Sequence, residues 1–409
     1  MRKSLVALNA VNFFMADVQS GLGPFLGVFL EQRHWSPAQI GVVMTIGGIS
    51  GMVVTTPLGA LVDRTRAKRA IVIVSAIIIT LASIAILLRP DFLVVASSQA
   101  LTGIAGAAVG PAIAAITLGL VFQKGFAHQL GRNEAFNHSG NVVAAVLAGA
   151  TGYVFGLGAA FVVLAVMAVL AVVAMLRVDP GEIDHRAARG ASEKDEGARI
   201  AGFAVLLRSV PLMILGVTLT LFHLGNAAML PLLGQAFVAR GAGDASAFTG
   251  ATIVVAQLTM VPVALLAARL AEARGYWIVF LVALVALPIR GVTASLVTGA
   301  WGLAPVQMLD GVGAGVLGVA VPGLVARILG GTGHVNAGLG AVMTLQGVGA
   351  ALSPTVGGIV AERFGYPAAF LGLGAVAVLA LVLWLLSRPI MTAACVKEPS
   401  GDRNAASAA

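Results

Sequence analysis

Long apolar runs follow one another along almost the whole chain, and short polar breaks separate them. A helix that crosses the hydrocarbon core of a bilayer needs about 20 such residues. Backbone groups in lipid must satisfy their hydrogen bonds internally, so each run is expected to be a helix. The pattern predicts membrane-spanning helices near residues 5–30, 38–58, 70–88, 92–121, 135–155, 159–176, 210–234, 247–267, 276–297, 303–326, 337–360 and 368–387.

One highly charged stretch, Arg177 to Arg208, interrupts this pattern in the middle of the chain. Charges at this density cannot lie in hydrocarbon, so the stretch predicts a linker between two halves of six helices each. The expected organisation is an N-terminal bundle at 1–176, a linker at 177–208, a C-terminal bundle at 209–388 and a tail at 389–409.

The two halves resemble each other when the chain is shifted by 209 positions. Three glycines, a Phe-Gly pair and an Ala-Ala-Phe triplet then coincide. The coinciding positions are Gly41 and Gly250, Gly140 and Gly349, Gly149 and Gly358, Phe155-Gly156 and Phe364-Gly365, and 159–161 and 368–370. Because each half has an even number of spans, the repeats are expected to be parallel and related by an axis along the membrane normal.

Composition agrees with a protein that has the bilayer as its main solvent. Only 10% of the residues are charged, against about 25% in a soluble domain. Most of the Lys and Arg residues fall in the breaks on one side of the predicted membrane, which places both termini in the cytoplasm. These loop positions account for the net charge of +8. No basic stripe is interleaved with aromatic residues, so a nucleic-acid partner is excluded.

The segment after the second predicted span reads Gly-Ala-Leu-Val-Asp-Arg-Thr-Arg-Ala-Lys-Arg from Gly59 to Arg69. It resembles the signature Gly-x-Leu-Ala-Asp-Arg-x-Gly-Arg-Lys/Arg of the major facilitator superfamily, with Arg66 in place of the second glycine. A degenerate copy lies at 268–275. The resemblance covers residues 5–387 and implies an all-α integral membrane fold of twelve transmembrane helices in two parallel-repeat bundles.

In that family the loop acts as a latch that breaks and reforms between the halves. The residues that match it are Gly59, Asp63, Arg64, Lys68 and Arg69. Orientation of the chain by its basic residues is the simpler alternative, although it requires neither the glycine nor the acid.

Two other family motifs are incomplete. Gln99 and Gly103 lie where proton-coupled exporters carry Arg-x-x-Gln-Gly, and the arginine is absent. An antiporter-like Gly-Pro motif occurs as 349–358 in the eleventh span instead of the fifth. Both departures weaken an assignment as a drug–proton antiporter.

Charged residues within spans are functional candidates because they are costly in lipid. Asp17, Arg290 and Asp310 are the three found here, and His223 adds a titratable group. The resemblance implies that spans 1, 4, 7 and 10 line a central cavity. The proton-coupling candidates are Asp17, Asp310 and His223, and the substrate-binding candidates are Gln19, Gln99, Asn226 and Gln307.

Simpler structural roles are the alternatives for these candidates. Arg290 lies at a depth similar to that of Asp310 on the adjacent span, which predicts an ion pair. Asp17 is the preferred proton carrier, and its alternative is a hydrogen bond to Gln19 or a neighbouring span. His223 has the alternative of a helix-to-helix hydrogen bond, and no role is assigned to His138 or to 132–134.

Paired helix breakers suggest where a solute would bind. Pro24 and Pro231 occupy corresponding places in spans one and seven. Interruptions at matching positions of two halves are typical of a transporter binding region.

The sequence therefore predicts a multi-pass cell-membrane transporter, in the inner membrane of an organism with two membranes. It is expected to move a small amphipathic organic solute by alternating access as a monomer, with proton coupling and efflux as the preferred mode. Proton-coupled uptake and a non-transporting scaffold or sensor are the alternatives. No P-loop and no metal-binding or catalytic spacing occurs, so an enzyme, a cofactor and a metal site are not expected.

Overall fold

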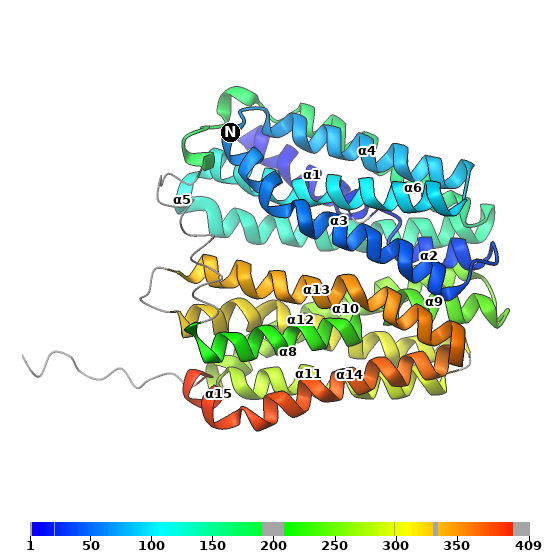
Figure 1. The fold of residues 1–409 in the computed structure, drawn as a ribbon. Coiled ribbons are helices and arrows are strands. Elements are labelled where there is room, and N and C mark those ends of the chain that lie inside the picture. Colours follow the sequence, from blue (N-terminus) through cyan, green and yellow to red (C-terminus); the bar gives the residue numbers. More distant parts are fainter. Residues whose placement is uncertain (1, 20, 190–207, 298, 330–333, 396–409) are drawn as a thin grey trace, which may run out of the picture.

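The computed structural model describes residues 2–19, 21–189, 208–297, 299–329 and 334–395. These residues form two bundles of long helices that lie side by side (Figure 1). Within this described part, every regular element is a helix. The all-helical fold expected from the apolar runs is confirmed.

The N-terminal bundle contains the helices α1 to α6. They are α1 (Arg2–Gln19), α2 (Pro24–Glu31), α3 (Pro37–Arg64), α4 (Lys68–Leu88), α5 (Phe92–Phe155) and α6 (Gly158–Leu176). Helix α5 consists of two helices joined at Phe122, whose backbone is not helical (φ 54°, ψ −178°). It therefore accounts for two of the expected spans.

The C-terminal bundle repeats this order. Its helices are α8 (Val210–Asn226), α9 (Met229–Ala239), α10 (Ala245–Arg274), α11 (Tyr276–Leu296), α12 (Leu303–Ile328), α13 (Val335–Phe364) and α14 (Tyr366–Leu386), followed by α15 (Arg388–Cys395). Short 3-10 turns lie at Pro180–Glu182, Ala187–Arg189 and Ala300–Gly302.

Eleven segments of the described residues are long and apolar enough to cross a membrane. The expected span at 135–155 is helical as the second part of α5, but it is not among these eleven. Its Asn137, His138 and Asn141 lower the local hydropathy. All three side chains are half-buried.

The two ends of the bundles are defined by the helix termini that lie there. One end, here called the linker end, carries the start of α1 at Arg2 and the ends of α3 at Arg64 and α10 at Arg274 (Figure 1, left). The opposite end, here called the far end, carries the starts of α3 at Pro37 and α10 at Ala245.

The first part of the expected linker packs against the N-terminal bundle. Val178, Ile183 and Ala188 are buried in its core. The backbone N–H of Asp184 donates to the carbonyl of Gly119 at 3.0 Å. The remainder of the expected linker, 190–207, lies outside the described residues.

The expected tail begins as helix α15, which packs on the C-terminal bundle. Cys395 is buried there as a free thiol, and burial raises the pKa of this thiol to about 12. Arg327 donates to the carbonyl of Cys395 and stacks over the ring of Tyr276. Residues 396–409 of the tail lie outside the described part.

The 209-residue repeat reappears in the packing of glycines. Gly140 lies against the carbonyl of Phe13 in α1, and Gly349 lies against the carbonyl of Thr220 in α8. In each half, therefore, the fifth span contacts the first at matching positions. A Cβ at either glycine would overlap a backbone oxygen, so the close approach requires glycine.

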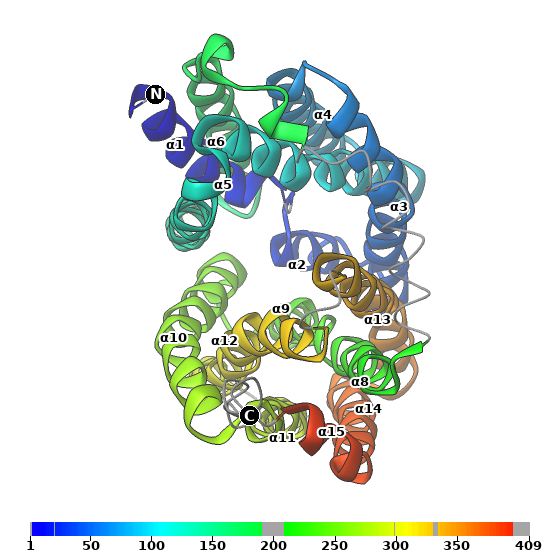
Figure 2. The same cartoon turned by 90° about the vertical axis from the view of Figure 1, so that its left-hand side faces the viewer.

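The most extensive contacts between the two bundles are made by two equivalent helix pairs, α3 with α13 and the second part of α5 with α10. In the view from the linker end, these pairs lie on opposite sides of the molecule (Figure 2). Gly41 meets the carbonyl of Pro354 in one pair, and Gly250 meets the carbonyl of Ala145 in the other. All four positions lie toward the far end, so the close backbone contacts between the halves are concentrated there.

Candidate functional site

A buried polar cluster joins three helices of the C-terminal bundle. Arg290 of α11 lies 2.7 Å from the carboxylate of Asp310 in α12, and its side chain is only 1% exposed. The same guanidinium donates to Asn226 of α8 at 2.6 Å and to Gln307 of α12 at 3.5 Å. Asn226 in turn donates to Asp310 at 3.4 Å. The Arg290–Asp310 pair expected from the sequence is therefore present.

A break in the seventh span positions Asn226. Helix α8 ends at this residue, and α9 begins at Met229. The break frees backbone groups, and the N–H of Ala228 donates to the buried hydroxyl of Ser353 in α13 at 2.9 Å. Irregular backbone at membrane depth is stable only when protein groups satisfy it in this way.

The first span is broken at the corresponding place. Helix α1 ends at Gln19, and α2 begins at Pro24. Between them, Gly21 and Gly23 have φ angles of 58° and 48°, which glycine adopts at no steric cost. The paired interruptions inferred from Pro24 and Pro231 are thus present in both halves.

Several buried polar atoms of the C-terminal cluster have no hydrogen-bond partner among the described residues. They are Nε of Arg290, Nε2 of Gln307 and Nε2 of His223. His223 lies three residues before Asn226, so the two side chains share one face of α8. A buried polar atom without a partner costs about 1–3 kcal/mol, and a solute with hydrogen-bonding groups would remove this cost.

The candidates of the N-terminal half lie apart from this cluster in the opposite bundle. Asp17 is half-buried in the last turn of α1, and Gln19 is exposed at the end of that helix. Gln99 is half-buried and packs against Gly47 of α3. Gln99 therefore contributes to the contact between α3 and α5.

Two basic residues of the motif between α3 and α4 bond to carbonyls of their own half. Asp63 and Arg64 are exposed, whereas Gly59 and Lys68 are buried. Lys68 donates to the carbonyl of Thr65 at 2.7 Å. Arg69 donates to the carbonyls of Met175 and Leu176 at 3.2 and 3.0 Å. These two carbonyls end α6, so Arg69 caps a helix of the same bundle.

Two polar contacts in the structure were not predicted from the sequence. His138 of α5 lies 3.1 Å from the amide oxygen of Gln257 in α10, and this contact joins the two halves. A buried polar cluster in the N-terminal half consists of the amides of Asn9, Gln129 and Asn133 and the hydroxyl of Thr117. Amides within apolar spans are the sequence signal for such contacts, but they do not identify the partner.

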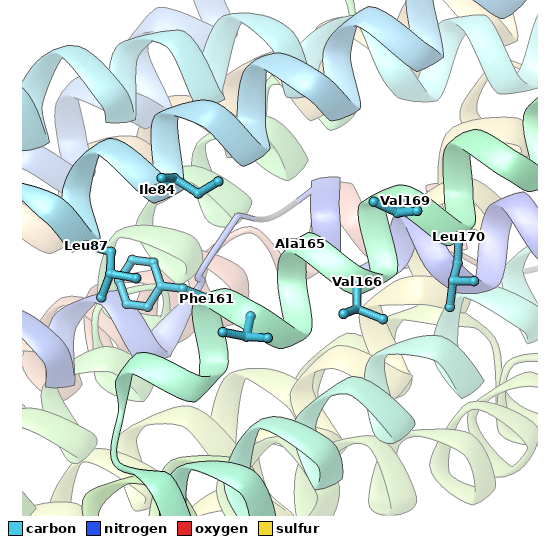
Figure 3. Close-up of a pocket in the computed structure, with 8 residues that line it drawn as sticks. Ile84, Leu87, Phe161, Ala165, Val166, Val169 and Leu170 are labelled. Carbon is cyan, nitrogen blue, oxygen red and sulfur yellow. The ribbon is translucent and has the colours of Figure 1, made fainter.

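A surface pocket between α4 and α6 has a different character (Figure 3). Its volume is about 380 Å³, and its walls are apolar side chains that include Ile84, Leu87 and Phe161. It contains none of the polar candidates. An acyl chain of a lipid suits such walls better than a polar solute.

No group of three or more His, Cys, Asp or Glu residues among the described positions could hold a metal ion.

Solved transporter structures have the same fold. The nucleoside transporter NupG matches with a TM-score of 0.77 over 94% of this chain and 98% of its own, at 14% identity. A POT family transporter in complex with a thioalcohol conjugated peptide matches with a TM-score of 0.76, at 14% identity, over 95% and 96% of the two chains. A bacterial homologue of the human lysosomal transporter Spinster, in an inward-facing and unoccupied conformation, has a TM-score of 0.75 at 14% identity, with 97% and 98% covered.

Closer relatives come from two strains of Mycobacterium tuberculosis, CDC 1551 / Oshkosh and H37Rv. Each is described as an uncharacterized MFS-type transporter and is 44% identical over 386 residues, which cover 94% of this chain and 92% of the relative. The model of the MFS_1 like family matches residues 5–372. On these matches, the chain belongs to the MFS_1 like family and is a multi-pass membrane transporter of the major facilitator type.

Proposed function

We propose that this transporter moves a small amphipathic organic solute out of the cell by alternating access, as a monomer driven by protons. The observation that carries the proposal is the buried cluster around Arg290 and Asp310 at the break of the seventh span. Buried ionisable groups at membrane depth are costly and are retained mainly where they serve transport.

The solute site is proposed around the C-terminal cluster. His223 and Gln307 supply ring and amide nitrogens without partners, and Asp310 supplies a carboxylate whose side chain is 16% exposed. The surrounding core is aliphatic and aromatic, with Phe222 and Leu219 buried nearby on α8. A few polar groups within an apolar environment suit a solute that has both an apolar body and a polar end.

Asp17 is the proposed proton carrier. It is the one acid well inside an expected span of the N-terminal half, and it lies one helical turn before the break between α1 and α2. Asp310 is a weaker candidate because Arg290 at 2.7 Å already compensates its charge. His223 is the third candidate, and its buried Nε2 is consistent with either a proton-binding or a solute-binding role.

The described conformation is proposed to be inward-facing. The close contacts between the halves lie toward the far end, and the basic linker end is proposed to lie in the cytoplasm. In this state the latch residue Asp63 is exposed. In the opposite state it is proposed to contact the C-terminal half.

Transport in proteoliposomes tests the proposal. A thermal-shift screen of the purified protein against metabolites and drugs first identifies a ligand, because binding to the folded state raises the apparent stability. The protein is then reconstituted, and pH gradients of both directions are imposed. Antiport of the ligand against protons supports efflux, whereas accumulation together with protons indicates uptake. A ligand that binds and is never transported indicates a sensor.

A further inference from the structure

A carboxylate of the C-terminal half contacts the start of a helix in the N-terminal half. Glu362 lies in the last turn of α13, at the far end. Its Oε2 accepts a hydrogen bond from the hydroxyl of Ser36 at 2.6 Å and another from the backbone N–H of Ala38 at 3.1 Å. Ser36 is the N-cap residue of α3, and Ala38 belongs to its first turn. Glu362 therefore caps α3 from across the interface.

Further polar contacts join the same two helices deeper in the interface. The hydroxyl of Thr355 donates to that of Thr45 at 2.8 Å, and the backbone N–H of Thr355 also bonds to Thr45 at 3.2 Å. Gly358 lies against the carbonyl of Pro37 without room for a Cβ. Hydrogen bonds thus hold the part of the α3–α13 contact that lies toward the far end.

The equivalent contact between α5 and α10 lacks these groups. A shift of 209 positions replaces Thr45 by Val254, Thr355 by Val146 and Glu362 by Tyr153. Gly149 packs on the carbonyl of Ser246 there, as the repeat requires. The backbone packing is therefore shared by both contacts, whereas the acid that reaches a helix start belongs to only one of them.

Helices α3 and α13 run in opposite directions, and each has an acidic residue in its last turn. Asp63 lies in the last turn of α3 at the linker end, and Glu362 lies in the last turn of α13 at the far end. Helix starts carry backbone N–H groups without intrahelical partners and a partial positive charge, which a carboxylate stabilises. Here the far-end acid is bonded, while Asp63 is exposed and α13 receives no hydrogen bond from the side chain of its N-cap residue, His334.

We propose that Glu362 is the far-end counterpart of the Asp63 latch and that its bond to the start of α3 holds the transporter in the far-end-closed state. The bond must break for the far end to open. This inference rests on alternating access as the proposed function, and it requires neither a known solute nor a coupling ion.

Thiol accessibility of the purified protein in nanodiscs tests the role of Glu362. Ala245 is buried at the far end in a core that both halves build, so a cysteine at this position reports opening. The native Cys395 is a poor competitor because its raised pKa keeps the thiol protonated at neutral pH. In this Ala245→Cys background, Glu362→Ala is expected to increase the rate of maleimide labelling about fivefold or more, the range of a typical conformational coupling.

The matched control is Arg363→Ala. Arg363 is exposed in the same last turn of α13, so the change removes the neighbouring charged side chain and leaves Glu362 in place. It is expected to leave the labelling rate unchanged. The double change Glu362→Ala with Ser36→Ala is expected to label at about the rate of Glu362→Ala alone. The reason is that Ser36 and Glu362 form the same contact across the interface.

The cross-test uses Asp63→Asn, which is expected to slow labelling by favouring the far-end-closed state. Combined with Glu362→Ala, it should return the rate toward that of the parent protein. Unchanged labelling in Glu362→Ala, or an equal increase in Arg363→Ala, would overturn the role of Glu362. Absence of transport in proteoliposomes, with the labelling pattern intact, would instead count against the proposed function alone.

Discussion

Arg290 and Asp310 form an ion pair of 2.7 Å between neighbouring helices, and the arginine side chain is 1% exposed. Asn226 and Gln307 complete the contacts of the guanidinium. The cluster thus connects the broken seventh span with α11 and α12. Its charges compensate each other. Substitution of one residue of the pair should therefore affect stability differently from substitution of both.

Removal of one charge of this pair should destabilise the protein more than removal of both. Arg290→Ala leaves the Asp310 carboxylate without its cation, at a cost of about 3–5 kcal/mol for a buried pair. Arg290→Ala with Asp310→Ala should recover much of the folded yield and the melting temperature. Size-exclusion profiles and thermal unfolding in detergent measure both quantities. A double variant as unstable as the single one would show that the two charges do not depend on each other.

Glycine packing between the fifth and first spans predicts opposite effects at two glycines of α5. Gly140→Ala should destabilise the fold by about 1–3 kcal/mol, the usual range for overpacking, because the new Cβ would overlap the carbonyl of Phe13. Gly131→Ala is the control, since its added Cβ would meet no side chain or neighbouring helix within 4 Å. That change should be neutral or slightly stabilising, because alanine favours helix more than glycine does.

Thermal unfolding of both variants checks this prediction, and Gly349→Ala repeats it in the other half. Gly349 meets the carbonyl of Thr220 in the same way. Equal stabilities of the Gly140 and Gly131 variants would mean that the helices can move apart at little cost.

Asp17→Asn keeps the shape of the side chain and removes its titration. The variant should still bind the ligand found by thermal shift, with a loss of any pH dependence. Transport driven by a pH gradient should fall by at least about tenfold, whereas exchange of solute without a gradient should persist. Asp310→Asn provides the comparison. Gradient-driven transport at the parent rate in Asp17→Asn would transfer the proton role to Asp310 or His223.

Orientation in the membrane can be tested with single cysteines at the two ends. Arg186 is exposed in the part of the linker that packs on the N-terminal bundle, and Ala242 is exposed in the loop before α10. A membrane-impermeant maleimide added to intact cells should label Ala242→Cys and spare Arg186→Cys. Gly243 is unsuitable because its φ of 137° disfavours any side chain. The reverse labelling pattern would place the linker end outside the cell.

The sequence alone determined which segments cross the membrane and how they repeat. Apolar length and helix formation are local properties, so each predicted span corresponds in the structure to one helix or to two helices separated by a short break. The register of 209 residues identified Gly140 and Gly349 before their contacts were known. The Arg290–Asp310 pair was also predictable, because two opposite charges at one depth on adjacent spans have few other partners.

Several outcomes depended on the tertiary structure. The first span was expected as one helix over 5–30, whereas α1 and α2 are separated between Gln19 and Pro24. Arg69 was assigned to a latch between the halves, and in this structure it caps α6 of its own half. The bond between Ser36 and Glu362 joins residues separated by 326 positions.

The reason for this division is physical. Partition into lipid and helix formation are decided over about 20 consecutive residues. The partner of a polar side chain depends on the rotation of each helix about its axis and on which of two conformations the halves adopt. Alternating access requires these conformations to differ by only a few kcal/mol. A balance that small depends on individual contacts such as that of Glu362 with α3, and only the packed structure reveals them.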